Sequence, residues 1–246
     1  MEKIISDRRQ SFCCKSGEIF RKYFKYADKK TAEHEGKYSR LYETIGINTP
    51  HFIRTGFSKK YSLFFNEYHY IDMIELSPAM LDESLLSKIL DLSGLVATSK
   101  IFPADGIDFW NQNYRANLTY ALNNLEKFVK VDSQLLLERV YSQKISVVMH
   151  GDFSLANMSL SNEKLYLYDF ASAGCSPKWW DLGYMIASLP PSLGKKIYDL
   201  FSYDENMLAC IQLAAAVKFG RGLRKCEEIE FRQNVFEYWS DLSSRQ

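Results

Sequence analysis

The chain opens with a pattern of hydrophobic positions that predicts antiparallel strands. β-Branched and aromatic residues are frequent in residues 10–14 and 18–24. Lys15-Ser16-Gly17 stands between these two segments, and a glycine at this place is typical of a tight hairpin turn. Two paired strands are therefore expected near the start of the chain.

The next hydrophobic positions predict a helix and two further strands. Within residues 31–45, apolar side chains recur every three or four positions, which indicates one buried helical face that ends at Gly46. An extended stretch begins at Pro50, and the aromatic-rich residues 61–70 predict another strand. Residues 1 to about 70 thus have the order strand, strand, helix, strand, strand.

From residue 84 onward the pattern is mainly helical, with two short apolar strands in the middle. A loop containing Pro103, Asp105 and Gly106 is expected after the first of these helices. Beyond Asp181 the helical pattern is broken at Pro190-Pro191 and at 220–222. Helices are predicted over 84–99, 111–129 and 133–141, and strands over 145–149 and 165–168.

This order of elements predicts an α+β fold. Its parts are a small N-terminal antiparallel sheet lobe with one helix, residues 1–72, and a larger, mainly helical C-terminal lobe, residues 73–246. A chain of 246 residues is long enough to bury a substantial core in such an arrangement.

Composition narrows the class of protein. Lys and Arg total 31 against 30 Asp and Glu, a net charge of +1, which argues against a protein that coats nucleic acid. No stretch approaches the roughly 20 apolar residues of a membrane-spanning helix, and the N-terminus lacks the apolar core of a signal peptide. The five cysteines are odd in number and lack metal-ligand spacing, so reduced thiols are expected in a cytoplasmic protein.

Three polar residues near the two middle strands suggest phosphoryl transfer from ATP, which depends mostly on positioning and charge. Asp152 follows the strand at 145–149 and precedes Asn157 by five positions, the spacing of a kinase catalytic loop. Asp169 stands at the end of the strand at 165–168, where it could hold Mg²⁺ between the phosphates. A turn with a chance Asp and Asn is the alternative, and three linked elements in the expected order argue against it.

At this point the sequence resembles the aminoglycoside phosphotransferase and choline kinase family. That family carries His-Gly-Asp-x-x-x-x-Asn, then Asp-Phe, then an Asp-Leu-Ala-like triplet. The corresponding segments here are 150–157, Asp169-Phe170 and Asp181-Leu182-Gly183. The resemblance is specific over residues 145–187 and weaker elsewhere. It implies a protein-kinase-like bilobal fold, the cofactors ATP and Mg²⁺, and a small-molecule hydroxyl acceptor.

The resemblance also implies roles for the matching residues. Asp152 would be the catalytic base or the group that orients the acceptor. Asn157 and Asp169 would be metal ligands. Asp181 would be a structural anchor beneath the catalytic loop, and His150 would support that loop without acting as a base.

The N-terminal part offers candidates for the nucleotide site. Lys22 lies on the second strand of the hairpin, which is the setting of a kinase phosphate-binding lysine, and Glu35 on the following helix is its expected partner. Lys25 and Glu33 are the rival choices. The hinge that meets adenine is expected at residues 66–68, with Glu67 and Tyr68, while Leu160 and Tyr168 are expected to pack near the adenine ring.

Two features depart from the family pattern. The loop expected to cover the phosphates, residues 6–11, contains no glycine. Arg8 and Arg9 could contact phosphate through their side chains, and an exposed basic turn without that role is the alternative. Ala171 stands where many members have an acidic residue.

The acceptor site is expected in residues 102–117 and in the helices after Asp181. Asp108, Trp110 and Tyr114, with nearby carboxylates and aromatics, suit a pocket for a cationic amino alcohol or aminosugar, and packing in the core is the alternative. A basic cluster with helical spacing could instead meet an anionic sugar or a lipid head group, or simply face solvent. Its members are Lys218, Arg221, Arg224 and Lys225.

These features predict a cytoplasmic enzyme, a phosphotransferase that moves the γ-phosphate of ATP to an alcohol group of a sugar, aminosugar or amino alcohol. A second hypothesis is a kinase for a sugar of a bacterial surface polysaccharide or lipopolysaccharide, with the basic helix as a docking face. The third is a non-catalytic binding or regulatory module that keeps the fold, as the glycine-free loop suggests. The presence of Asp152, Asn157 and Asp169 favours catalysis.

Overall fold

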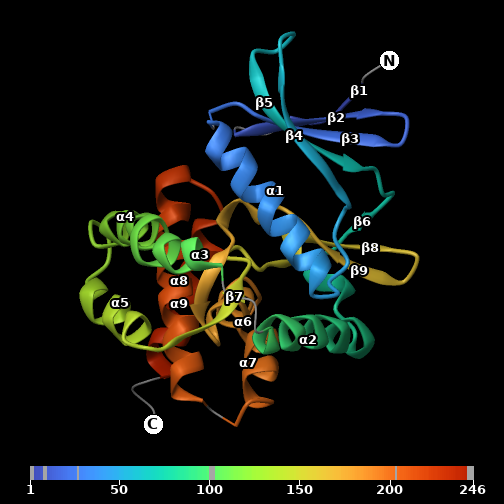
Figure 1. Ribbon diagram of the computed structural model, residues 1–246. Coiled ribbons are helices and arrows are strands. Elements are labelled where there is room, and N and C mark those ends of the chain that lie inside the picture. Colours follow the sequence, from blue (N-terminus) through green and yellow to red (C-terminus); the bar gives the residue numbers. More distant parts are fainter. Residues whose placement is uncertain (1–2, 8–9, 27, 100–102, 203, 243–246) are drawn as a thin grey trace. The chain divides into compact units, whose positions relative to one another are not determined.

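The computed structural model describes residues 3–7, 10–26, 28–99, 103–202 and 204–242 (Figure 1). Its internal packing divides the chain into two compact units. The first unit comprises Met1–Leu95 and Leu155–Ala173, and the second comprises Val96–Ser154 and Gly174–Gln246. The boundary expected at residue 72 therefore falls inside the first unit. Within the described ranges, every helix is too short or too polar to span a membrane.

An antiparallel five-stranded sheet forms the N-terminal part of the first unit, with the strand order β1-β2-β3-β5-β4. Gly17 has a positive φ of 60° in the turn between β2 and β3, as the predicted hairpin requires. The strands are β1 (Lys3–Asp7), β2 (Ser11–Ser16), β3 (Ile19–Phe24), β4 (Phe52–Ser58) and β5 (Leu63–His69).

Helix α1 (Lys29–Thr44) packs against β4 and β5 of this sheet (Figure 1). The Asp28 side chain caps the helix by accepting a hydrogen bond from the Thr31 backbone N–H. Gly36 allows a close approach, because a Cβ atom added there would lie 2.4 Å from the Phe52 ring. The sheet and the helix thus form a tightly packed layer pair.

The rest of the first unit contains a small antiparallel sheet in the order β6-β8-β9. The Leu167 backbone N–H donates to the Asn48 carbonyl at 3.0 Å, which ties this sheet to the segment after α1. Strand β8 was not predicted, because four residues carry too little alternation to be recognised. The elements are β6 (Ile74–Glu75), α2 (Glu83–Thr98, as far as Leu95), β8 (Met158–Ser161) and β9 (Lys164–Leu167).

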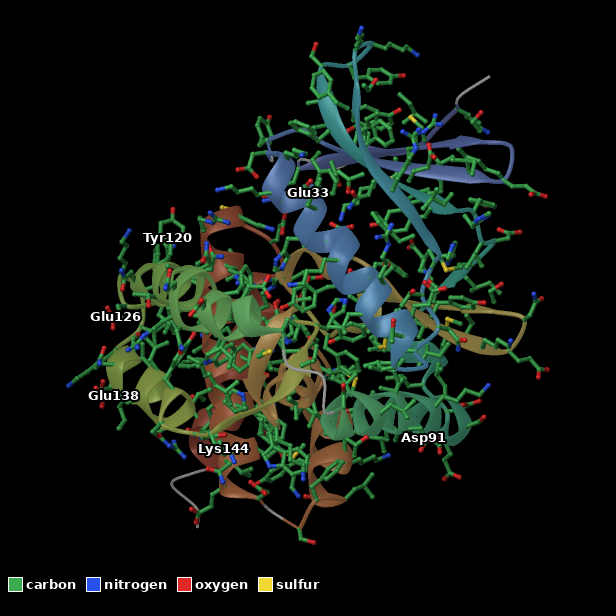
Figure 2. The ribbon with its side chains drawn as sticks, in the orientation of Figure 1. Glu33, Asp91, Tyr120, Glu126, Glu138 and Lys144 are labelled. Carbon is green, nitrogen blue, oxygen red and sulfur yellow. The ribbon has the colours of Figure 1, made fainter. Side chains whose placement is uncertain are left out.

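The second unit is mainly helical around α8, which contacts α4, α5, α6 and α9. Strands β7 (Ile145–Met149) and β10 (Gly174–Pro177) pair antiparallel beside the helices. Charged side chains such as Glu126, Glu138 and Lys144 lie on exposed faces (Figure 2). The helices are α3 (Ala104–Phe109), α4 (Arg115–Leu125), α5 (Ser133–Tyr141), α6 (Trp180–Ile186), α7 (Pro191–Asp199), α8 (Glu205–Lys225) and α9 (Ile229–Leu242).

The expected α+β class, with an N-terminal antiparallel sheet and a mainly helical C-terminal part, is confirmed. One local expectation was wrong. The predicted loop at Pro103, Asp105 and Gly106 is instead the start of α3, which continues through a π-helical turn, Trp110–Tyr114, into α4. Pro103 occupies the N-cap position, and Asp105 lies in the first turn, where the positive helix end favours an acidic side chain.

The expected helix break at 220–222 was also wrong, because α8 passes through it without interruption. Gly220 instead marks the closest approach of α8 to α4, where a Cβ atom would lie 2.1 Å from the Ala121 carbonyl oxygen. The break at Pro190-Pro191 is confirmed, since Pro191 is the first residue of α7.

Gly220→Ala is expected to destabilise the protein by about 1–3 kcal/mol, because the backbone of α4 must move to admit the methyl group. Urea unfolding measures this change. Gly94→Ala is the matched control: it is an exposed helical glycine with open space around it, so the same substitution should stabilise by roughly 0.5–1 kcal/mol. Equal effects of the two substitutions would contradict the close packing at Gly220.

Candidate active site

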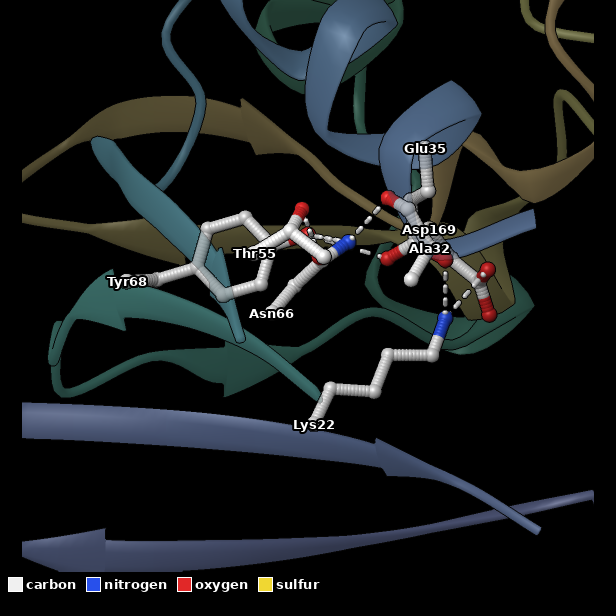
Figure 3. Close-up of polar contacts among 7 residues, drawn as sticks. All are labelled: Lys22, Ala32, Glu35, Thr55, Asn66, Tyr68 and Asp169. Atoms are coloured by element: carbon white, nitrogen blue, oxygen red, sulfur yellow. Dashed lines mark hydrogen bonds and ion pairs between the residues drawn. The ribbon is translucent and has the colours of Figure 1, made fainter. Parts of the chain in front are cut away.

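Lys22 is held between two carboxylates in the first unit (Figure 3). Its Nζ donates to Glu35 Oε2 and to Asp169 Oδ1, each at 2.8 Å. Lys22 lies on β3, Glu35 on α1 and Asp169 two residues after the end of β9. Three elements that are distant in sequence therefore meet at one ammonium group.

A network of neutral groups fixes Glu35 in place. The Tyr68 hydroxyl donates to Glu35 Oε1 at 3.0 Å, and the buried Asn66 amide donates to the Ala32 carbonyl at 2.9 Å (Figure 3). Thr55 Oγ1 in turn donates to Asn66 Oδ1 at 2.8 Å. These bonds join β4, β5 and α1, so the carboxylate that faces Lys22 has little freedom to move.

Electrostatics keeps Lys22 charged. Burial alone would lower the pKa of the ammonium group, but the charges of Glu35 and then Asp169 raise it above its usual value. Burial raises the pKa of the Glu35 carboxyl, an effect that the Lys22 ammonium opposes. The result is a buried cation with a fixed position, which is the state needed to bind phosphate oxygens.

The rival residues take other partners. Lys25 forms an ion pair with Asp7, and Glu33 pairs with Lys29 one helical turn away at 3.1 Å. Glu33 lies on the exposed face of α1 (Figure 2). The structure thus brings together the pair Lys22 and Glu35, and sequence reasoning did not anticipate that Asp169 contacts the same lysine.

The backbone at Asp169 is strained. Its φ of 67° and ψ of 66° lie in the left-handed region, which costs a non-glycine residue on the order of 1–3 kcal/mol. Contacts with α1 hold the following residues: Phe170 packs on Tyr42 with ring centroids 4.8 Å apart, and a His34 ring nitrogen lies 2.8 Å from the Ala173 carbonyl oxygen. The surrounding packing therefore holds Asp169 in this conformation.

The hairpin of β8 and β9 brings Asn157 and Asp169 to the same end of that hairpin. Met158 is opposite Leu167 in the register, and the Tyr168 backbone N–H donates to the Asn157 carbonyl at 3.1 Å. A carboxylate and an amide oxygen are ligand types that Mg²⁺ accepts together with water and phosphate oxygens. Where the chain is described, no three His, Cys, Asp or Glu side chains gather as metal ligands. A site with these two protein ligands would take its other oxygen ligands from nucleotide and water.

A cavity of about 280 Å³ opens beside Lys22 within the first unit. This volume is close to the lower end of the roughly 300–1,000 Å³ typical of ligand pockets. Its wall includes Glu35 and Asp169 as well as Tyr168, whereas Leu160 is not part of it. Ser6 and Ser11, at the ends of the expected phosphate loop, also line it, while Arg8 and Arg9 are outside the described residues.

Of the expected hinge residues, Tyr68 lines the cavity, whereas Glu67 does not. Glu67 and Tyr68 lie within β5, whose backbone pairs with β3 on one side and β4 on the other. The Glu67 carboxylate accepts hydrogen bonds from Arg21 and Arg54, which hold its pKa below the usual value against the opposing effect of burial. The cavity is instead lined by Tyr68 and by the residues that follow it, 69–71 and 73.

In the second unit, Asp181 anchors the turn that carries Asp152. Its two carboxylate oxygens accept hydrogen bonds from the backbone N–H groups of His150 at 2.6 Å and of Gly151 at 2.9 Å. Gly151 has a φ of 80°, which explains the need for glycine, and the Tyr114 hydroxyl donates to its carbonyl. The Asp152 backbone N–H faces the His150 ring at 3.3 Å. The turn after β7 is therefore fixed by buried partners on both sides.

Comparison with known proteins agrees with the sequence pattern. Residues 93–206 match the model of the phosphotransferase enzyme family. The family resemblance is confirmed. At the level of sequence, no curated protein matches the chain.

Solved structures of phosphotransferases share the fold. A choline/ethanolamine kinase family protein from Mesorhizobium loti is 10% identical with a TM-score of 0.63, over 98% of this chain and 87% of that one. An apo thermostable mutant of aminoglycoside phosphotransferase APH(4)-Ia is 12% identical with a TM-score of 0.65, over 100% and 94%. The streptomycin–ATP complex of APH(2")-IIa is 14% identical with a TM-score of 0.62, over 97% and 93%. The fold is therefore protein-kinase-like.

The residues expected to bind the acceptor do not lie together: two are buried and one is exposed. Trp110 and Tyr114 are 1% and 2% exposed, and their rings stack with centroids 5.3 Å apart. Trp180, also buried, donates from its indole nitrogen to the Tyr114 hydroxyl at 3.1 Å. Asp108 is exposed on α3. The two aromatic side chains thus pack in the interior of the second unit.

Sequence reasoning missed Tyr184, which lies beside Asp152. Burial, followed by the charge of Asp152, raises the pKa of Tyr184 above its usual value. Tyr184 lies three positions after Asp181 on α6, so the helical period places both on one face. That spacing is the signal by which it could have been found.

Proposed function

We propose that this chain is a cytoplasmic, ATP- and Mg²⁺-dependent phosphotransferase that moves the γ-phosphate to a hydroxyl of a small molecule. The observation that carries the proposal is the Lys22 ammonium, fixed by Glu35 and Asp169 in the wall of a cavity. A charged lysine held in this way supplies a cation for the α- and β-phosphates of a nucleotide. The presence of ATP in the complex of one solved structure with this fold supports the choice of nucleotide.

Each remaining polar residue then has a role. Asn157 and Asp169 would hold Mg²⁺, which neutralises the charge on the phosphates. Asp152 would orient the acceptor hydroxyl and accept its proton. Asp181 and His150 would keep the Asp152 turn in shape, and residues 69–71 with Tyr68 would meet the adenine base.

Lys22→Met is expected to weaken the binding of Mg²⁺–ATP by roughly 10- to 100-fold, the loss typical of a hydrogen bond to a charged group. Isothermal titration calorimetry measures the dissociation constant. Lys25→Met is the matched control, because Lys25 lies just beyond the same strand and its ammonium forms an ion pair with the exposed Asp7. Unchanged affinity in Lys22→Met, or an equal loss in both variants, would contradict the assignment of Lys22.

A further inference from the structure

Two cations lie next to Asp152 and have no part in the roles proposed so far. Lys218 and Arg221 are three positions apart on α8, so they share one face of that helix. Lys218 Nζ lies 3.6 Å from the centroid of the Tyr184 ring, and Arg221 Nη1 donates to the Tyr184 hydroxyl at 2.9 Å. Tyr184 follows Asp181 by three positions on α6, and Asp181 accepts hydrogen bonds from the backbone of His150 and Gly151, so Tyr184 and the two cations belong to the surroundings of the Asp152 turn.

Neither cation is neutralised by a direct carboxylate contact. Throughout the described part of the chain, Lys218 and Arg221 form no ion pair, whereas the neighbouring Arg232 pairs with Glu228 at 2.9 Å. Arg232 also donates to the Lys218 carbonyl at 2.9 Å, which places a third positive charge nearby. Two partly buried cations without a carboxylate partner are costly, so an anionic ligand would relieve a cost already present.

The electrostatics of Lys218 points the same way. Burial lowers the pKa of Lys218 to about 7, with a further lowering from Arg221 and Arg232 and an opposing effect of Asp152 and Glu228. A bound anion would stabilise the charged form of Lys218, because it replaces the hydration that the ammonium group loses on burial.

A site for a cationic acceptor has less support from the structure. A cationic acceptor would be bound by carboxylates and open aromatic faces. Trp110 and Tyr114, the aromatic residues expected for that purpose, are 1% and 2% exposed and packed together. Lys218 and Arg221 are partly exposed cations near Asp152 and remain available to an acceptor.

We infer that the acceptor is a hydroxylated oxyanion, a sugar or polyol that carries a carboxylate or phosphate group, and that Lys218 and Arg221 bind this group. The inference rests on the proposed function. In the reaction, the acceptor oxygen forms a bond to the γ-phosphorus of ATP while the bond from that phosphorus to the β–γ bridging oxygen breaks. ADP leaves, and the hydroxyl proton passes to Asp152.

The two cations also offset a repulsion. A carboxylate or phosphate ester brought close to the Asp152 carboxylate meets a like charge, and the two positive charges that contact Tyr184 compensate for it. The hypothesis of a surface-sugar kinase fits this charge pattern, because such saccharides include acidic sugars, and it becomes one possible source of the same anionic group.

The test compares one sugar skeleton with four charges. Glucose, glucosamine, glucuronate and glucose 6-phosphate are each titrated into the wild-type protein loaded with Mg²⁺ and ADP, and each is also assayed as an acceptor by ADP formation from ATP. Glucuronate or glucose 6-phosphate should bind at least about 10-fold more tightly than glucose, as a charged hydrogen bond provides. Tighter binding of glucuronate would indicate a carboxylate acceptor, and tighter binding of glucose 6-phosphate would indicate a phosphate acceptor.

Lys218→Met and Arg221→Gln should each remove most of this preference by raising the dissociation constant and KM for the anionic sugar roughly 10- to 100-fold. Arg224→Gln, an exposed cation on the same helix, is the control that should leave both unchanged. Tyr184→Phe keeps the ring under Lys218 but removes the hydroxyl, so it should keep the preference for anions. If Lys218 and Arg221 only positioned Asp152, their substitutions would instead lower kcat equally for charged and uncharged acceptors.

The inference is wrong if neither anionic sugar binds more tightly than glucose, or if the preference survives in both Lys218→Met and Arg221→Gln. Failure of the proposed function has a different signature: the anionic sugar binds selectively, but no phosphate is transferred in any arm of the assay. Retained binding of Mg²⁺–ATP without a preference for anions contradicts the acceptor class alone.

Discussion

Asp152→Asn should lower kcat by about 10²- to 10⁴-fold while the affinity for Mg²⁺–ATP stays nearly unchanged. The amide has the volume of the carboxylate, and the turn is held by backbone bonds to Asp181, so the loop should keep its shape. What is lost is the group that accepts the proton of the acceptor hydroxyl. Steady-state kinetics with the acceptor identified in the sugar comparison, together with calorimetry of ATP binding, separates the two effects.

Asp199→Asn is the matched control for this substitution. Asp199 belongs to the same unit and pairs with Lys195 at 2.6 Å on the surface of α7, remote in sequence from the loop. It should leave kcat and nucleotide affinity unchanged. If Asp152→Asn turns over at the rate of this control, Asp152 is not the group that faces the acceptor.

Asp169→Asn should weaken the Mg²⁺-dependent part of ATP binding by at least about 10- to 100-fold, the loss found when even outer-shell partners of a metal are removed. Asparagine is the informative choice because it tolerates the left-handed backbone that Asp169 adopts, so the segment around Phe170 should remain folded. Titration of ATP at several Mg²⁺ concentrations measures the effect.

The contrast with Lys22→Met makes this prediction specific. Removal of Lys22 should weaken nucleotide binding at every Mg²⁺ concentration, whereas Asp169→Asn should matter mainly when Mg²⁺ is present. Thermal unfolding without ligand checks that loss of one partner of Lys22 has not unfolded the first unit. An Asp169→Asn protein with the Mg²⁺ dependence of the wild type would contradict the metal-ligand role.

The sequence predicted those contacts that depend on the regular spacing of side chains within one strand or helix. Lys22 and Glu35 could be named because strand alternation and helical spacing decide which side chains face the layer between β3 and α1. Asp181 could be named as the anchor of the loop because the family pattern contains an Asp at this place. Gly17 could be placed because its turn requires a positive φ.

Contacts set by packing between distant segments could not be predicted in this way. The bond from Lys22 to Asp169 joins residues 147 positions apart, and no local period encodes it. Gly220 was interpreted as a helix break because its real reason, the approach of α4 to α8, exists only in three dimensions. The position of Glu67 depends on both neighbours of β5, and the burial of Trp110 depends on Tyr114, Tyr141 and Trp180.

The cations near Asp152 are a further example of contacts that the sequence alone could not predict. The helical spacing of Lys218 and Arg221 was visible in the sequence, but their contacts with Tyr184 on α6 exist only in three dimensions. The anionic acceptor that we infer therefore rests on tertiary contacts, whereas the proposed transfer chemistry rests on the spacing of the loop.

Phosphoryl transfer itself is tested most directly by ³¹P NMR of a reaction that contains the protein, Mg²⁺, ATP and the anionic sugars. The wild-type protein should produce ADP together with a new phosphate-ester resonance, and Asp152→Asn should produce neither at a comparable rate. Binding of ATP without a new phosphate ester from any hydroxylated acceptor, or equal product from Asp152→Asn, would contradict the proposed phosphotransferase.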